Sequence, residues 1–289
     1  MRIEDVRSIA VIGSGIMGAG IAQACAVAGY RVAMRDIGEA YLQKGIEAIR
    51  SSLKRGVERG KLTQERADGA LARIRATLDL AEAVKEADVV IEAVPENIEL
   101  KKQVFKELDE ISAEDAVLAT NTSSFSITEI ASATKRPSRV VGMHFFNPVP
   151  VMSLVEVIRG AATSDQTIQL IRELATRLGK TPVSVNEAPG FVVNRLLAPF
   201  LNEAMFCLME GTAEAKDIDT AIKLGLNHPM GPFELADLVG LDTTLAILEY
   251  MHKETGDPKY RPCPLLRKMV RAGRLGRKSG RGFYDYMAK

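Results

Sequence analysis

Short apolar runs alternate with longer amphipathic stretches over the first two-thirds of this chain. Apolar runs of about four to eight residues, bounded by glycine, proline or aspartate, are typical of buried parallel strands, and the longer stretches are typical of helices that cover such a sheet. The alternation predicts an α/β fold with a Rossmann-type, doubly wound, mostly parallel sheet. The expected strands are residues 9–12, 31–35, 88–94, 117–120, 140–144, 153–158 and 181–185.

Residues 39–76 interrupt this alternation. They are helical in composition, with charged residues in nearly every turn, and we expect breaks at Gly56 and Gly60. The segment therefore predicts a helical hairpin inserted after the second strand. A basic cluster near its connection is either a solvated face or a local site for an anionic ligand. Its members are Lys54, Arg55, Arg59 and Lys61.

The character of the chain changes near residue 187. The Pro189-Gly190 step has the composition of a boundary, residues 191–209 have helical periodicity, and no further strand is expected before the tail. We therefore predict a Rossmann-like domain at residues 1–186 and an all-α second domain at residues 187–289.

A glycine-rich turn, Gly13-Ser14-Gly15-Ile16-Met17-Gly18, follows the first expected strand. Gly13 permits a tight turn, Gly15 lets the backbone approach a pyrophosphate, and Gly18 lets the next helix pack close to the strand. Free N–H groups and the dipole at that helix N-terminus favour a phosphate. The turn therefore predicts dinucleotide binding, and Ile16 and Met17 count with the glycines as cofactor-binding residues.

An acid ends the second expected strand. Asp36 lies 23 residues after Gly13, near the usual offset for a carboxylate that binds the adenosine ribose. Because its charge repels a 2′-phosphate, NAD is favoured over NADP, although the neighbouring Arg35 leaves NADP open. FAD-binding proteins share this fingerprint and are an alternative at this point.

Composition limits the partners. The 289 residues suffice for two domains, and 38 basic against 37 acidic residues give a net charge of +1, so no overall field attracts nucleic acid or an anionic membrane. No apolar stretch is long enough to span a membrane, and the first strand begins too early to leave room for a signal peptide. Cys25, Cys207 and Cys263 lack disulfide-framework or metal-site spacing. We expect a cytoplasmic protein without a metal.

Three histidines are candidates for a proton carrier. His228 lies in an expected loop and His252 on an expected helix, so both are expected at the surface. His144 lies near the carboxyl end of an expected strand, the edge at which open α/β sheets bind ligands. Twelve residues later, Glu156 is an acid in an apolar strand, where a carboxylate is costly unless partnered. A strand–turn–strand excursion could join the two, either as an acid–base pair or as a satisfied core histidine beside a carboxylate held by backbone donors.

Six segments carry a family resemblance. They are Gly13 to Gly18, Val94-Pro95-Glu96-Asn97, Asn121-Thr122-Ser123-Ser124, His144-Phe145-Phe146-Asn147-Pro148-Val149-Pro150, Pro189-Gly190-Phe191-Val192-Val193-Asn194-Arg195 and Gly231-Pro232-Phe233. In this order they resemble the short-chain L-3-hydroxyacyl-CoA dehydrogenases, and among these the bacterial 3-hydroxybutyryl-CoA subgroup. The resemblance covers nearly the whole chain and argues against FAD. It implies NAD-dependent interconversion of L-3-hydroxyacyl-CoA and 3-ketoacyl-CoA by a homodimer, with substrate binding and dimerisation in the second domain.

The resemblance also implies roles for single residues. His144 matches the general acid and base, Glu156 the acid that orients it, and Ser123 and Asn194 the polar contacts of the reacting substrate. Ser52 matches a coenzyme A contact, and Arg59 replaces a family lysine that contacts phosphate, which favours the binding role of the basic cluster. Positions that line the nicotinamide half of NAD match Ala93, Glu96, Lys101, Ser123 and Asn147.

Two alternatives stay open. A β-hydroxyacid or 6-phosphogluconate type dehydrogenase shares the glycine turn and an all-α second domain but uses a lysine as proton carrier, so replacement of His144 discriminates. A dinucleotide-binding protein without turnover would leave NADH unchanged in the presence of acetoacetyl-CoA.

Overall fold

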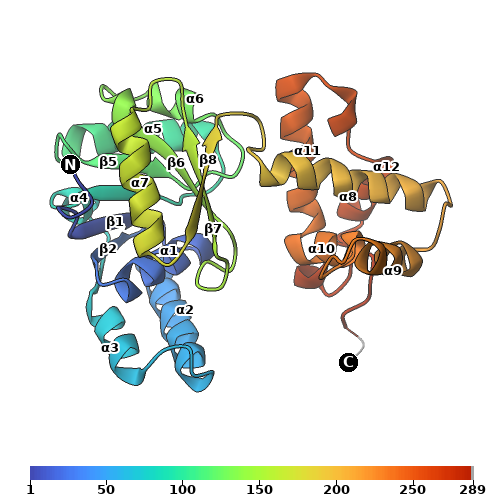
Figure 1. The fold of residues 1–289 in the computed structure, drawn as a ribbon, viewed down its shortest axis with the longest axis horizontal. Helices are drawn as coiled ribbons and strands as arrows, with labels where there is room; N and C mark the ends of the chain where they lie inside the picture. Colours follow the sequence, from blue (N-terminus) through green and yellow to red (C-terminus); the bar gives the residue numbers. More distant parts are fainter. Residues whose placement is uncertain (288–289) are drawn as a thin grey trace. The chain divides into compact units, whose positions relative to one another are not determined.

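The computed structural model describes residues 1–287, and the chain divides into two compact units, Met1–Ala188 and Pro189–Lys289 (Figure 1). The first unit holds one eight-stranded sheet in the order β3-β2-β1-β4-β5-β6-β7-β8. All neighbouring strands are parallel except β6 and β7. The strands are β1 Ser8–Ile12, β2 Arg31–Arg35, β3 Ile74–Thr77, β4 Val89–Glu92, β5 Val117–Thr120, β6 Val140–Phe145, β7 Leu154–Arg159 and β8 Thr181–Asn186.

The order of the strands explains where a ligand would bind. The chain runs outward from β1 to β2 and β3, then returns to place β4 on the other side of β1. Crevices form at the carboxyl ends of strands where the order reverses in this way, and Gly13 follows β1 at that point. The strands β4, β5 and β6 are buried throughout, as expected for a mostly parallel sheet between helical layers. The predicted fold class is confirmed.

Helices of the first unit begin at polar caps more often than not. Side chains of Thr63, Asp79, Asn97, Ser126 and Ser164 each accept a hydrogen bond from a backbone N–H in the first turn that follows. Such caps satisfy amide groups that the helix itself leaves without partners. The helices are α1 Ile16–Val27, α2 Glu39–Glu58, α3 Gln64–Ala72, α4 Leu80–Val84, α5 Ile98–Ile111, α6 Ile127–Ala131, the 3₁₀ turn η1 Pro137–Arg139 and α7 Asp165–Arg177.

The inserted segment departs from the prediction in two places. Gly56 does not break a helix, because α2 runs through it to Glu58 and the chain turns at Gly60, where φ is +66°. Residues 74–77 form the edge strand β3 on β2, with Val32 opposite Ile74, and are not helical. Its sequence, Ile-Arg-Ala-Thr, is not a continuous apolar run and none of its residues is fully buried, so a hydrophobic pattern does not reveal the strand. Pairing with β2 selects this conformation.

The second unit is helical, as the fold-class prediction states. Its core includes Met205 of α8 (Val193–Met209), Phe233 of α10 (Pro232–Val239) and Leu248 of α11 (Leu241–Thr255). The described residues of this unit contribute no strand to a sheet, only isolated bridges of Arg281 with Gly276 and Asp285. Its elements are α8 Val193–Met209, α9 Ala215–Gly225, α10 Pro232–Val239, α11 Leu241–Thr255, η2 Pro258–Tyr260, α12 Pro264–Arg271 and η3 Arg277–Ser279.

Two buried acids that sequence reasoning missed hold the end of this unit. Asp219 accepts hydrogen bonds from the Phe233 amide at 2.8 Å and the Tyr284 hydroxyl at 2.7 Å. Asp237 accepts from the amides of Phe283 and Tyr284, both at 3.0 Å. Burial and the neighbouring Asp219 carboxylate raise the pKa of Tyr284 above its ordinary value. The two carboxylates therefore fasten residues 283–286 to α9 and α10.

Candidate active site

The glycine turn is close-packed at two of its three glycines. At Gly13, where φ is +106°, a β-carbon would lie 2.6 Å from the Ala93 carbonyl oxygen, and at Gly18 it would lie 1.8 Å from the Gly13 carbonyl oxygen. Side chains are therefore excluded at both positions by the protein itself. At Gly15 a β-carbon would meet no atom within 4 Å. The first turn of α1 also carries no acid, which leaves its N–H groups and its positive dipole end available to a phosphate.

Asp36 is tied to this turn. Its Oδ2 accepts from the Ser14 amide and from the Ser14 hydroxyl, both at 2.7 Å, and its Oδ1 accepts from the Ile37 amide at 2.7 Å. The carboxylate thus stands beside the glycine turn at the end of β2, where a ribose contact requires it. Arg35, the residue because of which NADP stays an alternative cofactor, donates from Nε to the Leu78 carbonyl at 3.2 Å. These contacts fit the adenosine half of NAD.

His144 and Glu156 lie directly opposite each other on the antiparallel pair β6 and β7. His144 Nδ1 is 2.8 Å from Glu156 Oε2, and their side chains are 7% and 1% exposed. An ionised carboxylate only accepts hydrogen bonds, so Nδ1 carries the proton and Nε2 is the basic nitrogen. The Phe146 ring packs 4.5 Å from the imidazole, centroid to centroid. The structure thus brings together the two residues singled out in the sequence, in an arrangement that suits proton transfer.

A second polar network starts at the end of β4. Lys101 Nζ of α5 donates to Glu92 Oε1 at 2.7 Å and contacts Glu96 Oε2 at 3.1 Å. Glu96 Oε1 accepts from the Ser123 amide at 2.6 Å and from the Ser123 hydroxyl at 2.9 Å. Three of the expected cofactor positions, Glu96, Lys101 and Ser123, are therefore linked. Glu92 was not singled out, although it has the same signal as Glu156, an acid within an apolar strand.

The loop after His144 carries Asn147 and is fastened at its far side. Lys180 Nζ donates to the carbonyl oxygens of Val149 at 2.5 Å and Met152 at 2.8 Å. Burial lowers the pKa of Lys180 from its ordinary value. Asn121 Oδ1 accepts from the Phe145 amide at 2.9 Å, which joins the ends of β5 and β6. Asn147 itself is exposed at this edge.

The expected substrate contacts lie at α2, on α8 and, for Ser123, in the loop after β5. Ser52 is half-buried on α2, and Arg59 is the C-cap residue that directly follows this helix, so the two lie about two turns apart on one face. Lys54 of the basic cluster is 3.9 Å from Glu58 in an exposed ion pair. Asn194 lies in the first turn of α8, in the second unit, and is half-buried.

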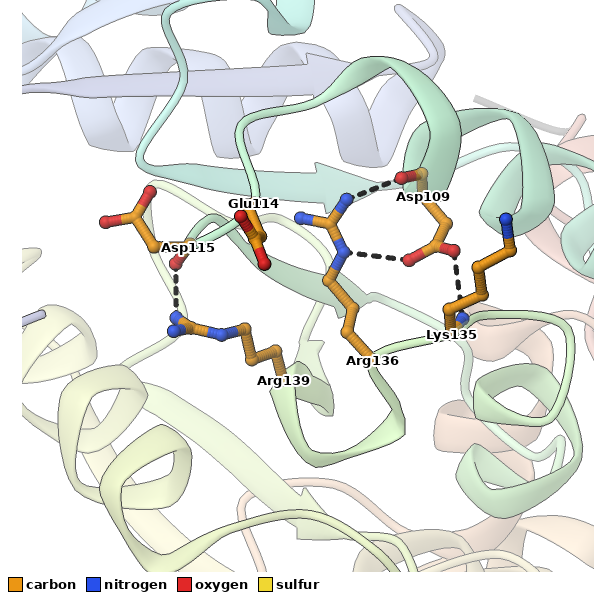
Figure 2. A pocket seen from close by; sticks show the side chains of 6 residues that line it. All are labelled: Asp109, Glu114, Asp115, Lys135, Arg136 and Arg139. Carbon is orange, nitrogen blue, oxygen red and sulfur yellow. Dashed lines mark hydrogen bonds and ion pairs between the residues drawn. The ribbon is translucent and has the colours of Figure 1, made fainter.

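The opposite, amino-terminal edge of the sheet has a polar cluster of a different kind. It lines a surface hollow of about 590 Å³. Figure 2 shows the side chains of this cluster. Arg136 Nε donates to Asp109 Oδ1 at 2.8 Å, and Arg136 also donates to the carbonyl oxygens of Asp109 and Ala113. Arg139 donates to the Asp115 carbonyl at 2.5 Å. These contacts close the connection between α5 and β5 and leave the carboxyl edge as the candidate site.

Two further classes of site find no support in the part of the chain that the structure describes. Residues 1–287 contain no group of histidine, cysteine and acidic side chains arranged to hold a metal ion. Within the same range, every helix is too short or too polar to cross a membrane.

Two family models together match nearly the whole chain. Residues 8–188 match the family model of the 3-hydroxyacyl-CoA dehydrogenase NAD binding domain, and residues 190–286 match that of the 3-hydroxyacyl-CoA dehydrogenase C-terminal domain. The chain is 53% identical to a probable 3-hydroxybutyryl-CoA dehydrogenase of Bacillus subtilis over 99% of both chains. It is 46% identical to human mitochondrial hydroxyacyl-coenzyme A dehydrogenase, over 97% of this chain and 91% of the human one.

A solved structure agrees with these relatives. The crystal structure of (S)-3-hydroxybutyryl-CoA dehydrogenase from Ralstonia eutropha superimposes with a TM-score of 0.94 at 51% identity, and the match covers 98% of this chain and 99% of that one. Prephenate dehydrogenase from A. aeolicus matches at 14% identity with a TM-score of 0.53, a likeness of fold alone.

Proposed function

The chain belongs to the 3-hydroxyacyl-CoA dehydrogenase family, and we propose that it interconverts 3-hydroxybutyryl-CoA and acetoacetyl-CoA with NAD(H), using His144 as general acid and base. The observation that carries the role of His144 is its buried hydrogen bond to Glu156, at the sheet edge that also holds the glycine turn. A histidine that is buried only for packing can take any hydrogen-bond partner. Where the partner is a carboxylate bound to Nδ1, the proton is held on Nδ1 and the basic nitrogen of the ring is Nε2.

The oxidation removes a proton and a hydride from the substrate, and each goes to a different acceptor. During oxidation, His144 Nε2 removes the proton of the 3-hydroxyl group while C3 becomes a carbonyl carbon; during reduction, the imidazolium returns the proton to the carbonyl oxygen. Bound NAD supplies the hydride acceptor, and NADH the donor. Glu156 holds the imidazole in one tautomer and stabilises the imidazolium.

Cofactor binding divides between the two halves of NAD. We assign the pyrophosphate and adenosine ribose to the glycine turn and the acid after β2, and the nicotinamide half to the ends of β4, β5 and β6. NAD is preferred over NADP, because Asp36 presents a negative charge where a 2′-phosphate would lie. The residues assigned are Gly13, Gly15, Ile16, Met17, Gly18, Asp36, Ala93, Glu96, Lys101, Ser123 and Asn147.

Substrate contacts are assigned by the family resemblance. Ser123 and Asn194 hydrogen-bond the oxygens of the reacting acyl group, and Ser52 and Arg59 bind coenzyme A. We propose a substrate with a short acyl group because the bacterial relatives carry the name 3-hydroxybutyryl-CoA dehydrogenase. A survey of 3-ketoacyl-CoA esters of rising chain length, each with NADH and NADPH, tests this. The largest kcat/KM is expected for acetoacetyl-CoA with NADH, and a maximum at a long-chain ester would overturn the short-chain assignment.

We further propose a homodimer formed through the second unit. Leu196 on α8 is 69% exposed, Met209 at the end of α8 is 45% exposed, and Val192 just before α8 is 42% exposed. Large apolar side chains exposed in this way are costly in water, and a twofold copy would cover some of them. Light scattering at micromolar concentration should give about twice 31.4 kDa. A mass near 31.4 kDa would refute the dimer.

The cytoplasm is the proposed compartment. All three cysteines are free, and Cys25 is completely buried, which suits a reducing environment. Fractionation of the native cells should place the protein with cytoplasmic markers, and its recovery with extracytoplasmic markers would contradict the proposal.

A further inference from the structure

We infer that Glu92, a buried carboxylate at the end of β4, is a positioning residue that holds the Ser123 hydroxyl through Lys101 and Glu96. The inference rests on the proposed function, in which Ser123 contacts the reacting substrate. Glu92 touches neither substrate nor cofactor in this account. It acts by fixing the direction of a hydrogen bond two groups away.

Glu92 is held from three segments of the chain. It is completely buried, and its Oε1 accepts from the Val94 amide and from Lys101 Nζ, both at 2.7 Å. Its Oε2 accepts from the Thr120 hydroxyl at 2.6 Å, on the neighbouring strand β5. A carboxylate without water is costly unless it is paired and hydrogen-bonded, and here both oxygens are engaged. The position of Glu92 is therefore rigid.

Lys101 transmits that position outward. Its side chain is 1% exposed, and its ammonium group lies 2.7 Å from Glu92 Oε1, 3.1 Å from Glu96 Oε2 and 3.2 Å from the Val94 carbonyl oxygen. An ammonium group has three N–H donors, and these three oxygens use all of them. Lys101 therefore works as a bridge between two carboxylates, one of which, Glu96, also contacts Ser123.

Glu96 divides its two oxygens between the bridge and the site. Oε2 faces Lys101, whereas Oε1 accepts from the Ser123 amide at 2.6 Å, the Ser123 hydroxyl at 2.9 Å and the Thr122 hydroxyl at 3.0 Å. The Glu96 side chain is 41% exposed. Water would compete for a carboxylate that is exposed to this degree, and the ion pair with Lys101 is what keeps Oε2 turned inward and Oε1 toward Ser123.

The amino-terminal edge of the same unit supplies a matched control. Asp109 and Arg136 also form a largely shielded ion pair, with side chains 6% and 15% exposed. Their remaining contacts end on backbone atoms around the connection from α5 to β5 (Figure 2). The Asp109 pair is therefore a brace of comparable burial without a link to Ser123.

The test compares Glu92→Gln with Asp109→Asn in the full-length protein, using NADH and acetoacetyl-CoA. Glu92→Gln keeps the shape but removes the charge that holds Lys101, and kcat is expected to fall about tenfold while the KM for acetoacetyl-CoA changes less than about twofold. Asp109→Asn should lower the thermal midpoint with kcat within about twofold of wild type. A normal kcat in folded Glu92→Gln, or an equal kcat loss in Asp109→Asn, would overturn the inference.

A double-mutant cycle with Ser123→Ala identifies the route. If Glu92 acts through Ser123, the double variant should have the kcat of Ser123→Ala alone. If the loss of kcat in the double variant is the product of the losses in the two single variants, the inference is overturned and the role of Ser123 stays intact. If Ser123→Ala alone has wild-type kcat, the assignment of Ser123 in the proposed function fails, and the positioning role fails with it.

A milder pair of variants covers the case in which Glu92→Gln does not fold. Thr120→Val removes the hydroxyl that donates to Glu92 Oε2, and Thr120→Ser restores it. We expect about a threefold loss of kcat in Thr120→Val and near-complete recovery in Thr120→Ser. Wild-type kcat in Thr120→Val would count against the inference, and so would failure of Thr120→Ser to recover.

Discussion

The two edges of the sheet in the first unit use the same kinds of side chain for different purposes. At the amino-terminal edge, Arg136 and Arg139 direct their donors to Asp109 and to backbone carbonyl oxygens of one connection. At the carboxyl edge, each buried carboxylate is linked to a side chain that can react. Glu156 continues to His144, and Glu92 continues through Lys101 and Glu96 to Ser123.

This difference separates structural polar networks from functional ones. A network that ends on backbone atoms satisfies groups that folding has buried, and its removal affects stability. A network that ends on an imidazole or a hydroxyl fixes the direction of a group that can react, and its removal affects rate. Burial and ion-pair distance alone do not distinguish the two kinds of network. The distance between Lys101 and Glu92 is 2.7 Å, and that between Arg136 and Asp109 is 2.8 Å.

The largest effect is expected at the carboxyl edge. His144→Gln should lower kcat by at least about a hundredfold, because positioned proton transfer contributes on the order of 10² to 10⁴ in rate. The affinity for NADH should stay within about twofold, since the glycine turn and Asp36 are untouched. Steady-state kinetics and a fluorescence titration with NADH measure both. A near-normal kcat would remove His144 from the mechanism and favour a lysine-based dehydrogenase.

At the amino-terminal edge, the expected effect is on stability alone. Asp109→Asn breaks the pair with Arg136 and should lower the free energy of unfolding by about 2 kcal/mol, less than for a fully buried pair because Arg136 is partly exposed. Denaturant unfolding and kinetics at a temperature well below the thermal midpoint check this. If kcat falls with stability, the contrast between the two edges is wrong.

The third prediction concerns the choice between NADH and NADPH, which we assign to Asp36 at the carboxyl end of β2. Asp36→Ala should weaken NADH binding and shift the ratio of kcat/KM for NADH over NADPH toward NADPH by about tenfold, because the ribose hydrogen bonds and the repulsion of the 2′-phosphate are both lost. Alanine also removes the hydrogen bonds to Ser14, so Ser14→Ala is the control for a disturbed turn. An unchanged ratio in Asp36→Ala would mean that this carboxylate does not face the ribose.

The smallest effect concerns the loop that carries Asn147. Lys180→Met keeps the length of the side chain but removes the hydrogen bonds to the carbonyl oxygens of Val149 and Met152. We expect the KM for NADH to rise about two- to threefold with kcat nearly unchanged, because the loop lies beside the proposed nicotinamide site and not on the proton path. Lys268→Met on α12 is the comparison for loss of a lysine elsewhere. A large loss of kcat would assign this loop to the chemistry itself.

The sequence predicts the fold well where one kind of signal dominates. Buried strands such as β5 are mostly apolar, and the glycine turn has its own spacing. The edge strand β3 is missed because its short, mixed sequence of half-exposed and exposed residues gives no such signal. Gly56 lies inside α2, since packing of that helix outweighs the small preference of one glycine for a break.

The candidate site is predictable in part, for a similar reason. An acid in an apolar strand draws attention to Glu156, and the same signal is present at Glu92. What the sequence does not contain is the direction of each side chain. Lys101 matches a nicotinamide-lining position, yet its ammonium group is buried between two carboxylates. That arrangement depends on the angle at which α5 leaves β4, which no local pattern encodes.

The most direct test of the central claim, that the carboxyl edge of this sheet performs NAD-dependent 3-hydroxyacyl-CoA oxidoreduction, is to mix the wild-type protein with NADH and acetoacetyl-CoA. Loss of absorbance at the NADH band is followed, and the product is analysed by chiral chromatography. The account predicts catalytic turnover with one L-3-hydroxybutyryl-CoA formed for each NADH consumed. Tight binding of NADH without turnover of any 3-ketoacyl-CoA would contradict it and identify a dinucleotide-binding protein that is not an enzyme.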